Sequence, residues 1–152
     1  MDKQNKIILA LLQEDATISI NEIAERVSLS ATACWKRIQK MTQEGIIRKQ
    51  VCLLDSKKLG MGVTVFVAIK TNHHDLQWLQ RFAAGVRDMP EVVEFYRMSG
   101  EIDYLLKVVV PDMDHYQKFL LGQLTRIEGV TSVRSSFVLN QVLSSTELPL
   151  EH

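Results

Sequence analysis

Apolar residues in the first fifty positions recur at the spacing that places them on one side of a helix. They stand at i, i+3, i+4 and i+7, the period of amphipathic helices that bury one face. Three such stretches follow one another, with apolar residues at Ile7, Ile8, Leu11 and Leu12, at Ile20, Ile23, Ala24 and Val27, and at Ala31, Cys34, Ile38 and Met41. The pattern predicts three helices that pack on one another, the first over about Lys3–Gln13.

The second and third helices are separated only by Ser28-Leu29-Ser30, which predicts a tight corner between them. Ser30 suits an N-cap, because its hydroxyl can accept a hydrogen bond from a free backbone N–H at the helix start. Gly45 is the expected stop of the third helix, and residues 46–54 are expected to be extended. Residues from about 20 to 39 therefore have the order of a helix-turn-helix, within a winged-helix-like arrangement.

The second half of the chain changes to a mixture of strand-like and helical patterns. Strand-like runs occur at 63–70, 92–98, 104–110 and 130–143, and helical patterns occur at 75–87 and 113–124. This βαββαβ order is typical of the ferredoxin-like fold, in which two helices cover one face of a four-stranded antiparallel sheet. The predicted fold class is therefore α+β.

Two glycines, Gly60 and Gly62, interrupt the pattern between the halves, and we place the domain boundary there. The expected domains are residues 1–60, helical with a connecting strand, and residues 61–152, ferredoxin-like. The first strand of the second domain is apolar on both faces, with Val65, Val67 and Ile69 on one and Phe66 and Ala68 on the other. Because helices cover only one face of such a sheet, we expect a second copy of the chain to cover the other.

Charge divides between the halves although the chain as a whole is neutral. Residues 1–60 hold 10 Lys and Arg against 7 Asp and Glu, whereas residues 61–152 hold 8 against 11. Between Arg26 and Gln43 there are four basic residues and no acidic one, which suits a helix that faces phosphates. A solvated helix with chance charge is the alternative, but the preceding helix and the corner favour a DNA-reading unit. The residues expected to contact double-stranded DNA are Ser30, Thr32, Ala33, Lys36, Arg37, Gln39, Lys40, Arg48 and Lys49.

Composition and short motifs argue against several other classes of protein. No apolar run is long enough to span a bilayer, and the first residues lack the apolar core of a signal peptide, so we expect a cytoplasmic protein. Cys34 is expected in the core, and its distance from Cys52 gives no support for a disulfide or a metal site.

His73-His74-Asp75 is the one short run whose side chains suggest a metal. Neighbouring side chains point apart in extended structure, so we expect an exposed loop in which Asp75 caps the next helix. No histidine, serine or cysteine lies in a recognisable nucleophile motif. Neither an enzyme nor a bound cofactor or metal is predicted.

Over about residues 2–149 the chain resembles the Lrp/AsnC family of bacterial and archaeal transcription regulators. The markers are Leu29-Ser30, Lys36-Arg37-Ile38, Glu44-Gly45-Ile46-Ile47, Leu53-Leu54-Asp55 with Leu59-Gly60, and Gly100-Glu101-Ile102-Asp103-Tyr104-Leu105. Taken jointly these markers are specific. The resemblance implies a helix-turn-helix domain followed by an amino-acid-responsive RAM or ACT-like domain, and a homodimer formed through the C-terminal sheets that assembles into larger rings such as octamers.

The resemblance also implies an effector site where subunits meet, beside the turn after the second strand of the sheet. The matching residues are Met98, Ser99, Gly100, Glu101, Asp103 and Tyr104 at the turn, and Ser135 and Ser136 on the last strand. Many members carry an acidic residue and then an aromatic one after the turn glycine, whereas this chain has Glu101-Ile102.

Simple chemistry supports an amino acid at this turn. A glycine turn can present backbone N–H groups to a carboxylate, and Asp103 or Glu101 can accept from an ammonium. A plain hairpin turn is an equally good interpretation of these residues on their own. Two functions therefore remain: a ligand-responsive transcription regulator, or a small-molecule-binding module whose helical domain docks a protein partner.

Overall fold

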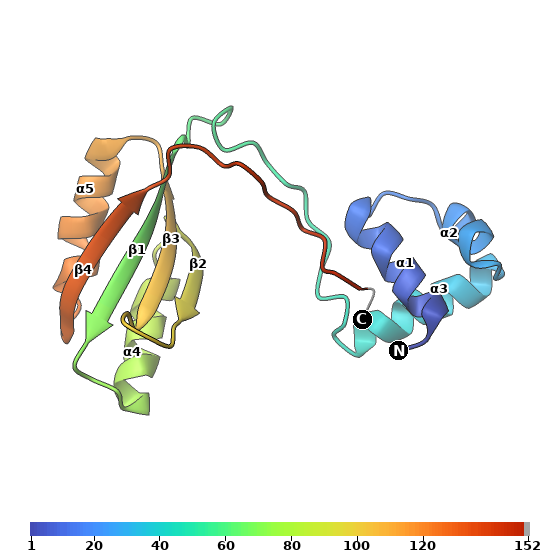
Figure 1. The fold of residues 1–152 in the computed structure, drawn as a ribbon, viewed down its shortest axis with the longest axis horizontal. Helices are drawn as coiled ribbons and strands as arrows, with labels where there is room; N and C mark the ends of the chain where they lie inside the picture. The colour runs from blue at the N-terminus through green and yellow to red at the C-terminus, as the bar shows by residue number, and fades with distance from the viewer. Residues whose placement is uncertain (151–152) are drawn as a thin grey trace. The chain divides into compact units, whose positions relative to one another are not determined.

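The computed structural model describes residues 1–150, which divide into two compact units (Figure 1). A helical unit contains Met1–Leu53 together with a C-terminal segment that begins at Val142, and a sheet unit contains Leu54–Gln141. The C-terminal segment is held by the side chain of Gln13, whose amide donates to the Leu148 carbonyl at 2.9 Å and accepts from the Leu148 N–H at 2.9 Å. The sequence predicts one boundary near Gly60 and so places this segment in the second domain. A contact across 135 positions leaves no local signal that could indicate otherwise.

Three helices form the N-terminal unit, as the apolar periodicity predicts. They are α1 (Lys3–Glu14), α2 (Ile20–Val27) and α3 (Ala31–Gln43), and each begins with a side-chain N-cap: Asp2, Ser19 and Ser30. The expected cap at Ser30 is confirmed, since its hydroxyl accepts from the Ala33 N–H at 3.1 Å. The buried core consists of Ile8, Ile23, Ala24, Val27, Cys34 and Met41, which confirms the interior position predicted for Cys34.

The corner between α2 and α3 is built by backbone geometry. Ser28 has a φ of 54°, a left-handed conformation, and it lets the Leu29 N–H turn back to the Ala24 carbonyl at 3.0 Å. At the other end of α3, Gly45 has a φ of 76° and the Ile46 N–H returns to the Met41 carbonyl at 2.9 Å. Glycine tolerates this region without the steric cost of a Cβ, so the predicted helix stop is confirmed.

Residues 46–54 do not form the connecting strand that we expected. From Arg48 to Leu54 these residues make no backbone hydrogen bond with another part of residues 1–150. A strand needs a neighbouring strand to accept its N–H groups and donate to its carbonyls. The β-branched and leucine-rich composition predicted extension correctly, but composition cannot supply a pairing partner.

The sheet unit confirms the predicted βαββαβ order. Its elements are β1 (Val63–Thr71), α4 (Leu76–Arg87), β2 (Val92–Arg97), β3 (Tyr104–Val110), α5 (Met113–Gly122), a short 3-10 turn η1 (Leu124–Arg126) and β4 (Val130–Phe137). The strands lie in the order β2-β3-β1-β4 and every neighbouring pair is antiparallel. This is the ferredoxin-like arrangement, which makes the chain an α+β protein with a helix-turn-helix unit.

One face of the sheet is covered by α4 and α5. Val65, Val67 and Ile69 of β1 are fully buried in a single cluster with residues of both helices, including Trp78, Phe82 and Phe119. The opposite face carries half-buried apolar residues, namely Phe66, Ala68, Leu105 and Val109, and we call these four residues the open face. The Lys107 ammonium and the Glu94 carboxylate lie 3.4 Å apart on the same side of the sheet.

The last strand is shorter than the sequence predicts, because it ends at Phe137 and not near Leu143. β4 lies at the edge of the sheet and pairs only with β1, with Phe137 opposite Val65. One further hydrogen bond joins the Val138 N–H to the Thr64 carbonyl at 3.0 Å, next to the first residue of β1. Beyond that point Leu139, Val142 and Leu143 are apolar. They do not extend the strand, because β1, the partner of β4, begins at Val63.

Candidate functional sites

The first candidate site is the exposed side of α3. Thr32, Lys36, Gln39 and Lys40 are exposed there, whereas Cys34 and Met41 on the opposite side are buried. Lys40 lies 3.8 Å from the Glu44 carboxylate, in a solvent-exposed pair that is worth little energy. Lys36 makes no ion pair within residues 1–150. Its ammonium is therefore available to an external anion.

The other predicted residues of this site lie around that surface. Ala33 is half-buried, and Ser30 uses its hydroxyl oxygen to cap the helix while keeping its O–H able to donate. Arg48 and Lys49 are exposed in the extended segment that follows Gly45. With the exception of Arg37, the predicted residues therefore present polar atoms or small surfaces to solvent near α3.

Arg37 has partners within the protein. Its guanidinium donates to Asp2 Oδ2 at 2.6 Å, to Asn5 Oδ1 at 3.0 Å and to Gln4 Oε1 at 3.1 Å. These acceptors belong to the first turn of α1 and its N-cap, so Arg37 ties the start of α1 to the middle of α3. The Asn5 N–H and the Arg37 guanidinium together hold the pKa of the Asp2 carboxyl below its usual value. The amphipathic pattern placed Arg37 at the flank of the helix, but it cannot reveal a partner 35 residues away.

Trp35 is a residue of this surface that the sequence-based site did not include. Half of it is exposed, at 50%, although tryptophan is the largest apolar side chain in the helical unit. It lies one turn from both Thr32 and Gln39 on the helix. The sequence signal that could have identified Trp35 was its spacing. It lies three residues after Thr32 and four before Gln39, which places the three residues next to one another on one side of the helix.

The second candidate site is the turn between β2 and β3. The Met98 N–H donates to the Asp103 carbonyl at 2.8 Å, which closes the hairpin, and Gly100 at its tip has a φ of 110°. Met98, Ser99, Gly100 and Glu101 are exposed at this tip. The turn therefore presents the backbone of Gly100 to solvent, together with the Glu101 carboxylate, which makes no ion pair within residues 1–150.

Asp103 and Tyr104 are directed elsewhere. The Asp103 carboxylate accepts from the Thr71 N–H at 2.8 Å, and its own N–H donates to the Ile69 carbonyl at 2.9 Å, so it fixes the end of β1. Tyr104 is buried, and its ring lies 4.9 Å from that of Phe82 in the core. Burial raises the pKa of the Tyr104 phenol above its ordinary value.

The two serines of the last strand point to opposite faces of the sheet. Ser135 lies opposite Val67 on the helix-covered face, where its hydroxyl shares a hydrogen bond with the Tyr116 hydroxyl. Ser136 lies opposite Phe66 on the other face and is exposed. β1 separates both from β3, so one chain does not bring either serine to the turn. Adjacent residues in a strand alternate faces, and that signal was present in the sequence.

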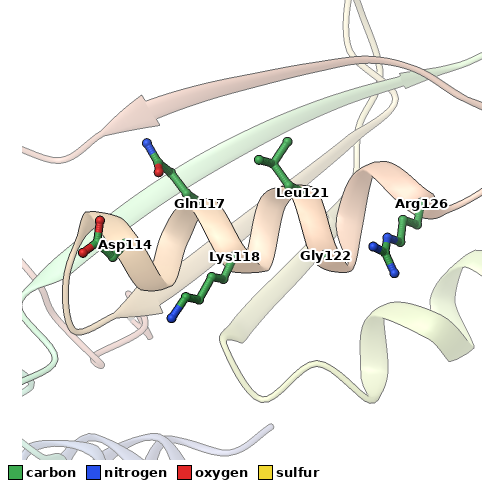
Figure 2. Close-up of a pocket in the computed structure, with 6 residues that line it drawn as sticks. All are labelled: Asp114, Gln117, Lys118, Leu121, Gly122 and Arg126. Carbon is green, nitrogen blue, oxygen red and sulfur yellow. The ribbon is translucent and has the colours of Figure 1, made fainter.

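Two hollows of the sheet unit contain no residue of the predicted effector site. A shallow one of about 540 Å³ runs along α5 and is drawn in Figure 2, where Asp114, Gln117, Lys118, Leu121, Gly122 and Arg126 line it. A smaller one of about 230 Å³ is lined by His73, Trp78, Arg81, Phe82, Ile127 and Glu128.

The His73-His74-Asp75 run has the structure that we expected. Asp75 caps α4 by accepting from the Trp78 N–H at 2.8 Å, and that bond is the main cause of the lowered pKa of its carboxyl. The His73 ring stacks on Trp78 with centroids 5.9 Å apart. Among residues 1–150 no three His, Cys, Asp or Glu side chains are grouped for a metal ion, and no helix is long and apolar enough to cross a membrane.

Comparison with known families accounts for both units. The model of a winged helix-turn-helix DNA-binding domain matches residues 1–48, and the model of the Lrp/AsnC ligand-binding domain matches residues 64–148. The chain is similar to the DNA-binding transcriptional activator DecR of Escherichia coli K12, at 45% identity over 151 residues that cover 99% of each protein. It is 43% identical to the glutamate uptake regulatory protein of Zymomonas mobilis over 94% of this chain and 87% of that protein.

Solved structures agree over the full length. An AsnC family transcriptional regulator from Agrobacterium tumefaciens has a TM-score of 0.92 and 50% identity, with 99% of this chain and 98% of that chain covered. The transcriptional regulator NMB0573 from Neisseria meningitidis, solved as a complex with L-Met, has a TM-score of 0.93 and 35% identity over 100% and 98% of the two chains. The chain belongs to the Lrp/AsnC family of transcriptional regulators, with a DNA-binding helix-turn-helix unit and a ligand-binding sheet unit.

Proposed function

We propose that α3 is the recognition helix and that it enters the major groove of double-stranded DNA in a sequence-specific manner. The observation that carries this proposal is its exposed side, which presents Lys36 and Lys40 while the helix contains no acidic residue. Cationic side chains neutralise phosphates and release counterions, which supplies the sequence-independent part of the affinity. Arg48 and Lys49 extend this basic surface beyond the helix.

Base recognition falls to the first turns of α3, because the N-terminal part of a recognition helix is the part that reaches base edges. Thr32 and Ala33 lie in the first turn of α3 and have small side chains suited to such contacts. The Gln39 amide lies about two turns further along the helix and is suited to a contact with a base or a phosphate there. Ser30 keeps a free O–H that can donate to a phosphate. Arg37 acts in this proposal as a positioning residue, which fixes the orientation of α3 through the start of α1.

The DNA proposal is tested by the salt dependence of binding. In fluorescence anisotropy with a promoter fragment, the double variant Lys36→Ala, Lys40→Ala should bind more weakly, and its plot of log affinity against log salt should be shallower by about 2, since each phosphate contact contributes about 1. The double variant Lys57→Ala, Lys58→Ala removes the same charge from exposed positions outside the helical unit and is the matched control. Equal slopes in the two double variants would overturn the assignment of α3.

We also propose that an amino acid or a similar small metabolite binds at the turn between β2 and β3, where subunits meet. Exposed backbone at Gly100 suits a carboxylate, and Glu101 is the carboxylate left free for an ammonium. The relative from Neisseria meningitidis, which was solved with L-Met, supports this ligand class. Met98, Ser99, Gly100 and Glu101 are all exposed on a single chain, so the proposal needs a neighbouring subunit to enclose the site.

The proposed assembly is a homodimer in which two open faces meet, and dimers of this kind would build an octamer. Phe66, Ala68, Leu105 and Val109 offer apolar surface that neither helix of the sheet unit covers, and burying such surface stabilises association. Ser136 lies on the same face and would approach the partner, whereas Ser135 is already bonded to Tyr116. With DNA as its target, the regulator would act in the cytoplasm.

A thermal-shift screen of the twenty amino acids tests the effector proposal. A ligand that binds only the folded state raises the melting temperature by mass action. The alternative function, in which the helical unit docks a protein, predicts binding through apolar contacts that changes little with salt, so the anisotropy titration separates the two.

A further inference from the structure

Trp35 is exposed where the helical unit has no structural use for it. The core of this unit is closed by Ile8, Ile23, Cys34 and Met41, and Trp35 is neither among its buried residues nor among the partly buried ones around it. The other tryptophan, Trp78, is only 4% exposed and serves the core of the sheet unit. Leaving half of a tryptophan in water forfeits the stabilisation that its burial would supply.

The position of Trp35 gives the reason for this exposure. It is the fifth residue of α3, in the N-terminal half of the helix, and its neighbours on the exposed side are Thr32, Lys36 and Gln39. A polyanion is therefore the surface best matched to its surroundings. Within the major groove, the apolar groups on base edges are the C5-methyl groups of thymines.

We propose that Trp35 is a specificity-determining residue, whose indole lies against thymine methyl groups when α3 occupies the major groove. This inference rests on the proposed function, because it requires α3 to be the recognition helix. Lys36 and Lys40 supply affinity for any sequence, whereas Trp35 gains only where a methyl group meets its ring. Thymine and uracil differ by that methyl group alone, so Trp35 separates the two bases while the lysines do not.

The test uses the full-length protein and the duplex that wild type selects most strongly from a random-sequence pool. Each thymine in this duplex is replaced in turn by deoxyuridine, and affinity is measured by anisotropy. Replacement should weaken wild-type binding about fourfold at one or two positions, the factor expected for losing one buried methyl group. In Trp35→Ala the same replacements should have no effect, and Trp35→Phe should retain part of the discrimination.

Two comparisons keep this inference separate from the function it rests on. If Lys36→Ala leaves affinity and salt slope unchanged, α3 does not face DNA, and both proposals fail. If Lys36→Ala weakens binding but Trp35→Ala still discriminates thymine from deoxyuridine as wild type does, the role of Trp35 alone is overturned. If Trp35→Ala discriminates thymine from deoxyuridine as wild type does and also forms a smaller oligomer in sedimentation, Trp35 makes a protein contact instead. That result would equally overturn the proposed role of Trp35 in DNA recognition.

Discussion

Gly129, just before β4, is the glycine of the sheet unit with the closest neighbours, and the substitution Gly129→Ala tests their effect. Gly129 has a φ of 91°, and a Cβ added there would lie 2.4 Å from Trp78 Nε1 and 2.7 Å from His73 Cδ2. The indole cannot easily move away, because its Nε1–H donates to the Glu128 carbonyl at 2.9 Å and its ring is stacked on Phe82. The added methyl group must therefore displace a well-packed core residue.

The expected loss of stability has two parts. A residue with a Cβ at such a φ costs about 1–3 kcal/mol in backbone strain. Forcing an extra carbon into a packed site costs about 1–3 kcal/mol more. Gly100 has a φ of 110° but nothing within 4 Å of an added Cβ, so Gly100→Ala should pay only the first part. The two variants should differ by about 2 kcal/mol, the steric part alone.

Urea unfolding measures this difference when it is followed by tryptophan fluorescence in a Trp35→Phe background. Trp78 is then the one tryptophan left in the chain, and it lies in the core of the sheet unit. Gly129→Ala should unfold at a clearly lower urea concentration than Gly100→Ala. If both variants lose the same stability, backbone strain is the whole cost, and the close approach of Gly129 to Trp78 contributes nothing.

Three further predictions concern the effector, the assembly and the helical unit. Asp103→Asn keeps an oxygen to accept from the Thr71 N–H, so the fold should persist. If the Asp103 charge binds the effector, calorimetry should show weaker effector binding by this variant. An unchanged effector affinity would leave that role to Glu101. Leu105→Asp should give monomers in sedimentation, and an intact dimer would exclude the open face as the interface. The lowered pKa of Asp2 adds stability above about pH 3.8, and this stability is lost as pH falls through the pKa of Asp2 in the folded protein. In Asp2→Asn, the stability of the helical unit should therefore depend less on pH in this acid range, as followed by circular dichroism.

The features predicted correctly from sequence are those with a local cause. Ser30 and Asp75 could be identified as N-caps because the capped N–H lies three residues away. Gly45 could be identified as a stop because a left-handed residue ends a helix within one turn. The βαββαβ succession of elements likewise followed from segments that are each periodic on their own. Each of these signals is contained in a window of a few residues.

The features missed are those that depend on a distant partner. Arg37 looked like a phosphate contact until Asp2, Gln4 and Asn5 were brought beside it by folding. Asp103 looked free for an ammonium, yet its carboxylate is bound to the Thr71 N–H across the sheet. A sequence shows that such a side chain is charged or polar, but only the fold shows which residue it is hydrogen-bonded to.

The bond between Gln13 and Leu148 has a consequence for the order of events during synthesis. The helices emerge from the ribosome first and contain mainly local contacts, so they can form early. The residue that pairs with Gln13 is made 135 positions later, after the whole sheet unit has been translated. The helical unit therefore gains this pair of hydrogen bonds only after the sheet unit has been made, so this step of its folding comes late.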